Sequence, residues 1–180
     1  MRILGIETSC DETAAAVVED GRVLLSNVVA SSIDLHAAYG GVVPEIAARS
    51  HIEHMMPVVD RALRQAFDQS PVTSHQSLET RDQGLKTNSL WDQVDAIAVT
   101  QGPGLGGSLL AGVLTARTLA IAKKKPLYAV NHVAAHPFAT FITLQGPSLQ
   151  GYMLPKEAPE FPMLALIVSG GHSQIVLFQS

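Results

Sequence analysis

Two histidines four residues apart, His132 and His136, are the side chains in this sequence best suited to bind a metal ion. Residues at this spacing leave the same face of a helix, where two imidazoles can bind one divalent cation. The apolar run 126–130 just before them is typical of a strand, so the pair should begin a helix at a strand's carboxyl end. Ligands of open α/β sheets bind at such ends. Two solvated surface histidines are the alternative interpretation.

The polar turn 8–13 could also take part in chemistry, because it holds three hydroxyls and two carboxylates between two apolar runs. Hydroxyls and turn amides can hold phosphate oxygens, and the carboxylates of Asp11 and Glu12 can hold a metal or its waters. A turn capped by its own side chains accounts for the same residues.

The glycine-rich loop 102–107 lies between a strand pattern and a helix pattern, where anions often bind. Its glycines satisfy G-x-G-x-x-G, but a dinucleotide fold also needs an acidic residue about 20 positions further on. Asn131 occupies that place, so the pattern excludes this fold. Close helix–sheet packing and phosphate contact both stay open for the loop.

Two other groups of residues are weaker candidates. The turn 169–172 offers backbone amides, a hydroxyl and an imidazole to a ligand, or is a plain hairpin turn. His51 and His54 are expected on a solvated helix face, since no carboxylate or glycine site accompanies them. The His-Glu-x-x-His motif is absent, so nothing supports a zinc protease.

Composition limits the classes of protein. The 180 residues are 47% hydrophobic and 16% charged, enough for one core and the beginning of another. The net charge of −4 indicates no generally basic surface, so a nucleic-acid substrate would need a local patch or another subunit. The single cysteine excludes an internal disulfide framework. With no signal-peptide pattern and no apolar run of about 18 residues, we expect a cytoplasmic location and no membrane contact.

The elements that would position these side chains form a mixed-sheet α/β domain. Three antiparallel strands should open the chain, followed by a helix that Pro57 should kink or divide, and a strongly amphipathic helix should follow the glycine loop. The last hairpin resembles the three-strand opening beginning again, which suggests two related lobes. We expect a first lobe at 1–162 with a polar surface insertion at about 68–90, and the first hairpin of a second lobe at 163–180. The expected strands are 3–6, 14–18, 22 onward, 94–100, 126–130, 163–168 and 173–178, and the expected helices are 44–67, 108–123 and the histidine helix.

Five motifs in order closely resemble the tRNA threonylcarbamoyladenosine transferase family, once named O-sialoglycoprotein endopeptidases. The resemblance runs from Met1 to about Phe178, apart from the polar insertion and the loop 145–162. The motifs are Gly5-Ile6-Glu7-Thr8-Ser9-Cys10-Asp11-Glu12-Thr13-Ala14, Gly40-Gly41-Val42-Val43-Pro44-Glu45-Ile46-Ala47, Gly102-Pro103-Gly104-Leu105, His132 to His136, and Val168-Ser169-Gly170-Gly171-His172.

The resemblance implies an actin-like, sugar-kinase-like ATPase fold (ribonuclease H-like) of two lobes. It implies transfer of threonylcarbamoyl from threonylcarbamoyl-AMP to N6 of the adenosine beside the tRNA anticodon. One iron or zinc ion would sit in the cleft, with ATP or ADP as a further occupant, and could polarise the donor carbonyl. The implied roles are His132 and His136 as metal ligands, Asp11 and Glu12 as catalytic residues, and Ile167, Val168, Ser169, Gly170 and Gly171 as contacts of the donor.

This chain departs from the family pattern. Family members are longer, and their third metal ligand, an aspartate, falls in the part not present here. Pro137 follows the second histidine and is expected to distort the pair, since it cannot donate a hydrogen bond to the carbonyl of Val133. We therefore expect the chain alone to be inactive.

The implied partners are tRNA and other subunits of the complex that forms threonylcarbamoyladenosine. The helix 44–67 is the expected contact surface, with a homodimer as the alternative occupant. Two other functions stay open: a non-catalytic scaffold paralogue of the same tRNA-modifying complex, which generally lacks the histidine pair, and a small-molecule kinase of the same superfold.

Overall fold

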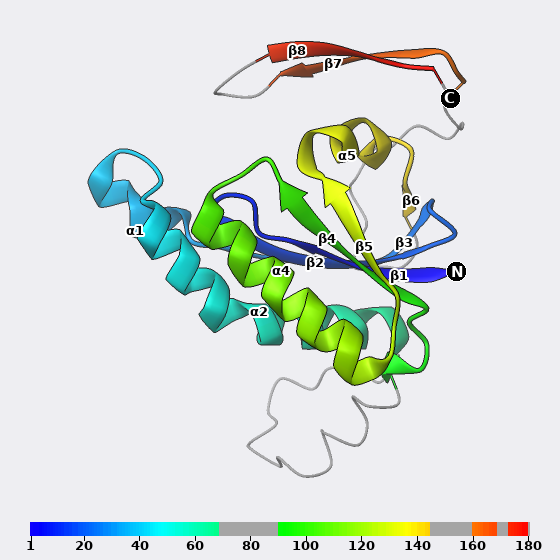
Figure 1. Ribbon diagram of the computed structural model, residues 1–180, viewed down its shortest axis with the longest axis horizontal. Helices are drawn as coiled ribbons and strands as arrows, with labels where there is room; N and C mark the ends of the chain where they lie inside the picture. The colour runs from blue at the N-terminus through cyan, green and yellow to red at the C-terminus, as the bar shows by residue number, and fades with distance from the viewer. Residues whose placement is uncertain (69–89, 145–159, 169–172, 180) are drawn as a thin grey trace.

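The computed structural model describes residues 1–68, 90–144, 160–168 and 173–179, which form a six-stranded mixed sheet and a separate hairpin (Figure 1). The order in the large sheet is β5-β4-β1-β2-β3-β6, and β7 pairs with β8. The strands are β1 (Arg2–Glu7), β2 (Glu12–Glu19), β3 (Val23–Ser31), β4 (Ala96–Gly102), β5 (Leu127–Asn131), β6 (Thr143–Leu144), β7 (Met163–Val168) and β8 (Ser173–Phe178). The helices are α1 (Ile33–His36), a 3-10 turn η1 (Ala37–Tyr39), α2 (Pro44–Phe67), α4 (Gly106–Lys123) and α5 (His132–Ala139).

The three-strand opening is confirmed. Strands β1, β2 and β3 pair antiparallel, and the β2–β3 turn places Asp20 and Gly21 at φ angles of 52° and 69°. Two consecutive residues with positive φ are typical of the tight turns that match strand twist, which explains the Asp-Gly pair. Strands β4 and β5 then run parallel to β1, so the carboxyl ends of these three strands lie at one edge.

Helices α2 and α4 cover one face of this sheet, and α5 lies on the other side (Figure 1). Leu4 and Ile97 of the sheet and Leu63 of α2 are fully buried in the core between them. Residues 69–89 of the expected surface insertion lie outside the described residues. Leu90, at its end, is only 7% exposed and belongs to this core, because the chain returns there before β4 begins.

Pro57 does not divide the helix, which was one of the two outcomes, a kink or a division, that the sequence predicted. Helix α2 is continuous from Pro44 to Phe67 with Pro57 inside it. Met55, Val58 and Val59 are all buried on both sides of the proline. Their packing against the sheet offsets the loss of one backbone hydrogen bond, so the helix continues.

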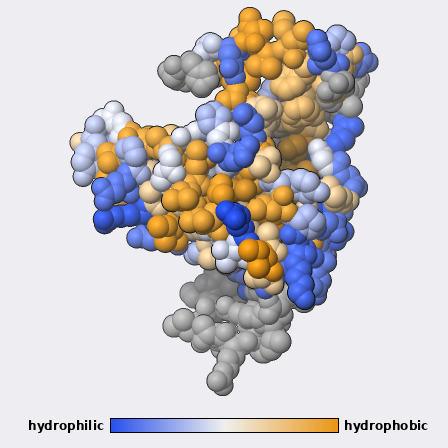
Figure 2. Space-filling model, in the orientation of Figure 1, coloured by the Kyte–Doolittle hydropathy of each residue, from blue (hydrophilic) through white to orange (hydrophobic). Residues whose placement is uncertain are grey.

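Helix α4 is not the strongly amphipathic helix that its sequence suggested. Its buried residues are mostly small, with Ser108, Gly112 and Ala116 toward the core. Leu110, Leu114 and Ile121 are 57%, 51% and 78% exposed, and apolar atoms gather on this side of the molecule (Figure 2). Small residues let the helix lie close to its neighbours, and its larger apolar side chains are then left outward.

Replacing Gly112 with alanine is expected to destabilise the fold. The added Cβ would lie 2.3 Å from Oγ1 of Thr8, a fully buried side chain. Overpacking of this kind costs about 1–3 kcal/mol. Alanine gains about 1 kcal/mol over glycine inside a helix. The cost exceeds this gain where the neighbouring atoms cannot move away. Because Thr8 is held by its own hydrogen bond to Ser108, we expect a net loss in urea unfolding. Gly106→Ala is the control, since no atom lies within 4 Å of its added Cβ, and an equal response of both variants would contradict the prediction.

The predicted final hairpin is confirmed at both strands. Its register pairs Leu164 with Leu177 and Leu166 with Ile175, and all four side chains are more than half exposed on one face. It lies beyond α5, which it contacts through Phe138 and Phe178, with ring centroids 5.5 Å apart (Figure 1).

Within the described ranges, no helix is both long and apolar enough to cross a membrane.

Candidate functional site

The histidine pair lies where the parallel strands end. Strand β5 finishes at Asn131, and α5 begins with His132, as the sequence predicted. The side-chain oxygen of Asn131 accepts a 3.0 Å hydrogen bond from the backbone N–H of Ala134. This residue therefore caps the helix, which explains the amide found where a dinucleotide fold needs an acid.

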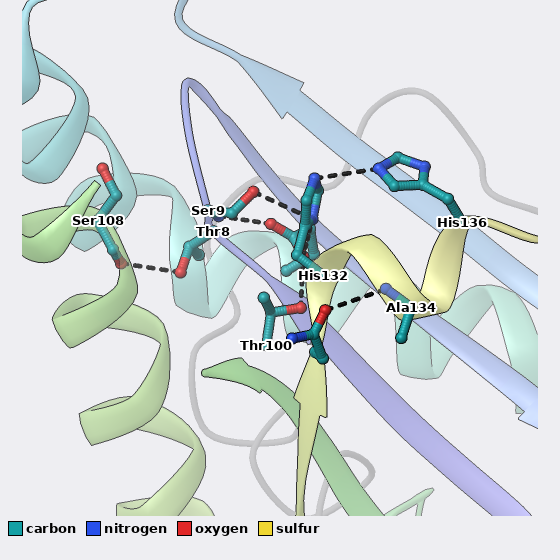
Figure 3. A network of polar contacts seen from close by, with 9 residues as sticks. Thr8, Ser9, Thr100, Ser108, His132, Ala134 and His136 are labelled. Carbon is teal, nitrogen blue, oxygen red and sulfur yellow. Dashed lines mark hydrogen bonds and ion pairs between the residues drawn. The ribbon is translucent and has the colours of Figure 1, made fainter. Parts of the chain in front are cut away.

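The two imidazoles face each other across one turn of α5 (Figure 3). Nε2 of His132 lies 3.1 Å from Nε2 of His136, with the rings at 83°. Two zinc–nitrogen bonds of about 2.0–2.1 Å at a tetrahedral angle would hold their nitrogens about 3.3 Å apart. The observed separation is close to that value, so both nitrogens fit one cation.

The expected distortion of this pair by Pro137 is wrong. Helix α5 continues to Ala139 with Pro137 inside it, and the imidazoles still converge. The missing N–H affects only the carbonyl one turn earlier, and Pro137 is itself buried, so packing holds the turn in place.

Glu7, at the end of β1, is the residue of this site that the sequence analysis did not single out. Its Oε2 lies 3.2 Å from Nδ1 of His132, and it accepts hydrogen bonds from the Thr100 hydroxyl and the Ser9 backbone N–H. The Ser9 hydroxyl lies 3.3 Å from the same Nδ1. Burial alone would raise the pKa of Glu7, but these hydrogen bonds lower it below its usual value. The one signal for Glu7 in the sequence was its position as an acid directly after an apolar run.

The hydroxyls of the turn 8–13 bond to the protein rather than facing outward. Oγ1 of Thr8 donates to the Ser108 carbonyl at 2.8 Å, and Thr8 is fully buried (Figure 3). Oγ1 of Thr13 lies 2.8 Å from Nδ1 of His51. Thr8 and Thr13 thus tie the turn to α4 and α2, and their hydroxyls are already bonded within the core.

His51 is not on a solvated helix face, contrary to the sequence prediction. It is fully buried, and its Nε2 lies 3.1 Å from the Cys10 carbonyl. A carbonyl only accepts, so Nε2 donates and Nδ1 accepts from Thr13. His54 is half-buried and bonds within its own helix to Ser50. His51, but not His54, therefore holds the turn 8–13 in place.

The buried His51 should make stability depend on pH. Burial lowers the pKa of His51 from its ordinary value of 6.5. As the pH falls below about 6.5, His51 therefore takes up a proton more readily in the unfolded chain than in the folded one. The contribution of neutral His51 to the free energy of unfolding is fully present above about pH 6.5 and is lost as the pH falls through the lower pKa of the folded chain. We expect the free energy of unfolding to fall less steeply toward acid in His51→Gln than in the unaltered chain. Urea unfolding from about pH 8 to pH 5 measures this slope. His54→Gln is the control and should keep the slope of the unaltered chain. Equal slopes for the unaltered chain, His51→Gln and His54→Gln would contradict the prediction.

The glycine loop packs against the same turn. An added Cβ at Gly104 would lie 2.5 Å from the Ser9 carbonyl oxygen, and that oxygen accepts a 2.8 Å hydrogen bond from the Leu105 N–H. Of the two interpretations left open, close packing therefore applies to Gly104.

The other predicted site residues form no bond with the histidine pair within the part of the chain that the structure describes. Asp11 is half-buried and Glu12 exposed at the start of β2. Among the described residues, no hydrogen bond or ion pair joins either carboxylate to the histidines. In β7, Ile167 is half-buried and Val168 is 69% exposed. Ser169, Gly170 and Gly171 lie outside the described residues.

A hollow of about 550 Å³ adjoins the histidine pair. It lies between α5 and the face of the sheet that α2 and α4 leave uncovered, and its walls are mainly small or apolar, including Ala16, Ala98 and Val130. Glu7, His132 and His136 supply its polar end. Over the described ranges, no group of three or more His, Cys, Asp or Glu side chains could hold a metal, so the pair offers two ligands.

Comparison with known proteins gives one consistent result. The sequence model described as tRNA N6-adenosine threonylcarbamoyltransferase matches residues 23–71 and 78–180. A protein of that name from Thermomicrobium roseum is 49% identical over 99% of this chain and 42% of its own length. Another from Anaeromyxobacter sp. is 47% identical over 97% of this chain and 43% of its own. Among solved structures, YeaZ from Pseudomonas aeruginosa covers 73% of this chain and 45% of its own, with 21% identity and a TM-score of 0.43. The chain spans less than half the length of the curated relatives it matches.

Proposed function

Because this chain belongs to the tRNA N6-adenosine threonylcarbamoyltransferase family, we propose that it supplies the metal-binding portion of an enzyme that modifies tRNA. The reaction transfers threonylcarbamoyl from threonylcarbamoyl-AMP to N6 of the adenosine beside the anticodon. The amine nitrogen forms a bond to the donor carbonyl carbon, the bond to the AMP oxygen breaks, and the amine loses a proton.

The observation that supports this proposal best is the convergence of His132 and His136 on one point at the end of three parallel strands. The pair would hold one iron or zinc ion, which supplies a Lewis acid for the donor carbonyl when bound. Water, or residues outside this chain, would complete the ligands. The adjoining hollow, with its small and apolar walls, would leave room for the donor beside the pair.

The donor-binding residues belong to the proposal as well. Ile167, Val168, Ser169, Gly170 and Gly171 would contact threonylcarbamoyl-AMP, and Asp11 and Glu12 would act at the mouth of the site, where ATP or ADP could also bind. Main-chain amides in a glycine turn are suited to an anionic leaving group.

We further propose that residues 1–162 form one lobe of an actin-like ATPase fold and that 163–180 begin the second. The exposed apolar face of the β7–β8 hairpin would then pack against the rest of that lobe, and the chain alone would be inactive. Ile52 and Met56 of α2 are 72% and 51% exposed, which suits contact with another subunit of the complex or with a second copy. The proposed location is the cytoplasm, with tRNA as substrate.

A chimera tests this function directly. The chain would replace the matching amino-terminal 42% of the Thermomicrobium roseum relative, keeping the remainder of that protein. We expect the chimera to transfer radiolabelled threonylcarbamoyl to tRNA, and the chain alone to transfer none. In the chimera, His132→Ala should lower the rate of transfer by at least about 10²-fold, which is the loss typical of removing an electrostatic catalyst.

The intact relative is the positive control, and cooperative unfolding shows that the chimera is folded. A folded chimera that binds tRNA but transfers nothing would contradict the proposal and favour the scaffold function.

A further inference from the structure

We propose that Glu7 is a positioning residue that fixes the tautomer and direction of His132, so that its Nε2 faces the metal. This rests on the proposed function, since it assigns a role beside the same histidine pair. Glu7 would act through His132 and would not itself touch the metal.

The contact geometry sets the direction of the proton. Glu7 Oε2 lies 3.2 Å from Nδ1 of His132, on the opposite side of the ring from Nε2. A carboxylate only accepts hydrogen bonds, so Nδ1 must carry the proton in the neutral ring. Nε2 then keeps its lone pair, and this nitrogen is the one that faces His136 at 3.1 Å. A carboxylate behind a ligating imidazole also makes it a stronger metal ligand.

Glu7 is itself held at two points. The Thr100 hydroxyl on β4 donates to Oε2, and the Ser9 backbone N–H donates to Oε1. The carboxylate therefore joins the ends of β1 and β4 to the first residue of α5. Its side chain is 34% exposed, so it is only partly screened by water.

The Ser9 hydroxyl alone could not do the same. It lies 3.3 Å from the same Nδ1, but a hydroxyl can either donate or accept. It would therefore satisfy both tautomers of His132 equally. In Glu7→Gln the carboxamide oxygen would stay with the Ser9 backbone N–H, which only donates, so the amide NH2 would face Nδ1 of His132 and donate to it. The substitution thus removes the preference for Nδ1–H while it keeps size and shape.

The test measures Zn²⁺ affinity and the His132 tautomer together. Isothermal titration of the chain with Zn²⁺ alone should show binding that weakens about tenfold to 100-fold in Glu7→Gln. Glu45→Gln is the matched control, because Glu45 pairs with Arg49 on the surface, 78% exposed, and should leave affinity unchanged. ¹⁵N NMR of the metal-free, unaltered chain should show the Nδ1–H form of neutral His132, and a shift toward the Nε2–H form in Glu7→Gln.

Two results would overturn the inference. One is a His132 that carries its proton on Nε2 in the unaltered chain, which needs no variant to fold. The other is unchanged Zn²⁺ affinity in a folded Glu7→Gln. If His132→Ala also leaves affinity unchanged, the metal assignment in the proposed function fails too; if His132→Ala abolishes binding while Glu7→Gln does not, only the role of Glu7 fails.

Discussion

His132→Ala combined with His136→Ala is expected to abolish Zn²⁺ binding by the chain. The pair supplies the two ligands that the described residues bring together, and their Nε2 atoms lie 3.1 Å apart. Losing a supporting group behind a ligand costs about 10- to 100-fold in affinity, so losing both ligands should cost more. Equilibrium dialysis followed by elemental analysis measures bound metal, and we expect the zinc bound by the double variant to fall to that of protein-free buffer.

The control for this experiment is His54→Ala, which removes a half-buried imidazole whose hydrogen bonds to other described residues lie within α2. It should bind as much zinc as the unaltered chain. Because His136 is exposed and His132 is 32% exposed, the double variant should stay folded, with a modest loss of stability from the lost contact between Glu7 and His132. A folded double variant that keeps its zinc would contradict the site.

Local sequence signals located the strands and the histidine helix. The opening strands and the last hairpin follow from apolar runs with a turn between them, and the Asp20-Gly21 turn has the φ angles that its residues favour. The histidines fell at the start of a helix because Asn131 caps it directly after a strand. These features depend on residues close together in the chain, which a sequence displays.

The errors involve contacts between distant segments. His51 was expected in solvent, but it bonds to Thr13 and the Cys10 carbonyl, which lie about 40 residues earlier. Glu7 meets His132 across 125 residues, so neither neighbourhood indicates the other. Pro57 is tolerated because tertiary packing holds both halves of the helix.

Trp91→Ala is expected to remove much of the stability of the fold. The sequence analysis assigned Trp91 no role, yet it is 4% exposed in the core beside Leu90, and the Lys123 ammonium lies 5.6 Å from its ring centroid. Truncating a buried tryptophan costs about 3–5 kcal/mol, against a total stability of about 5–15 kcal/mol for a typical domain. Urea unfolding measures the loss. Tyr39→Ala, at a ring that is 65% exposed, should change stability by less than about 0.5 kcal/mol. Equal losses in the two variants would show that the chain returning at Leu90 does not anchor the core.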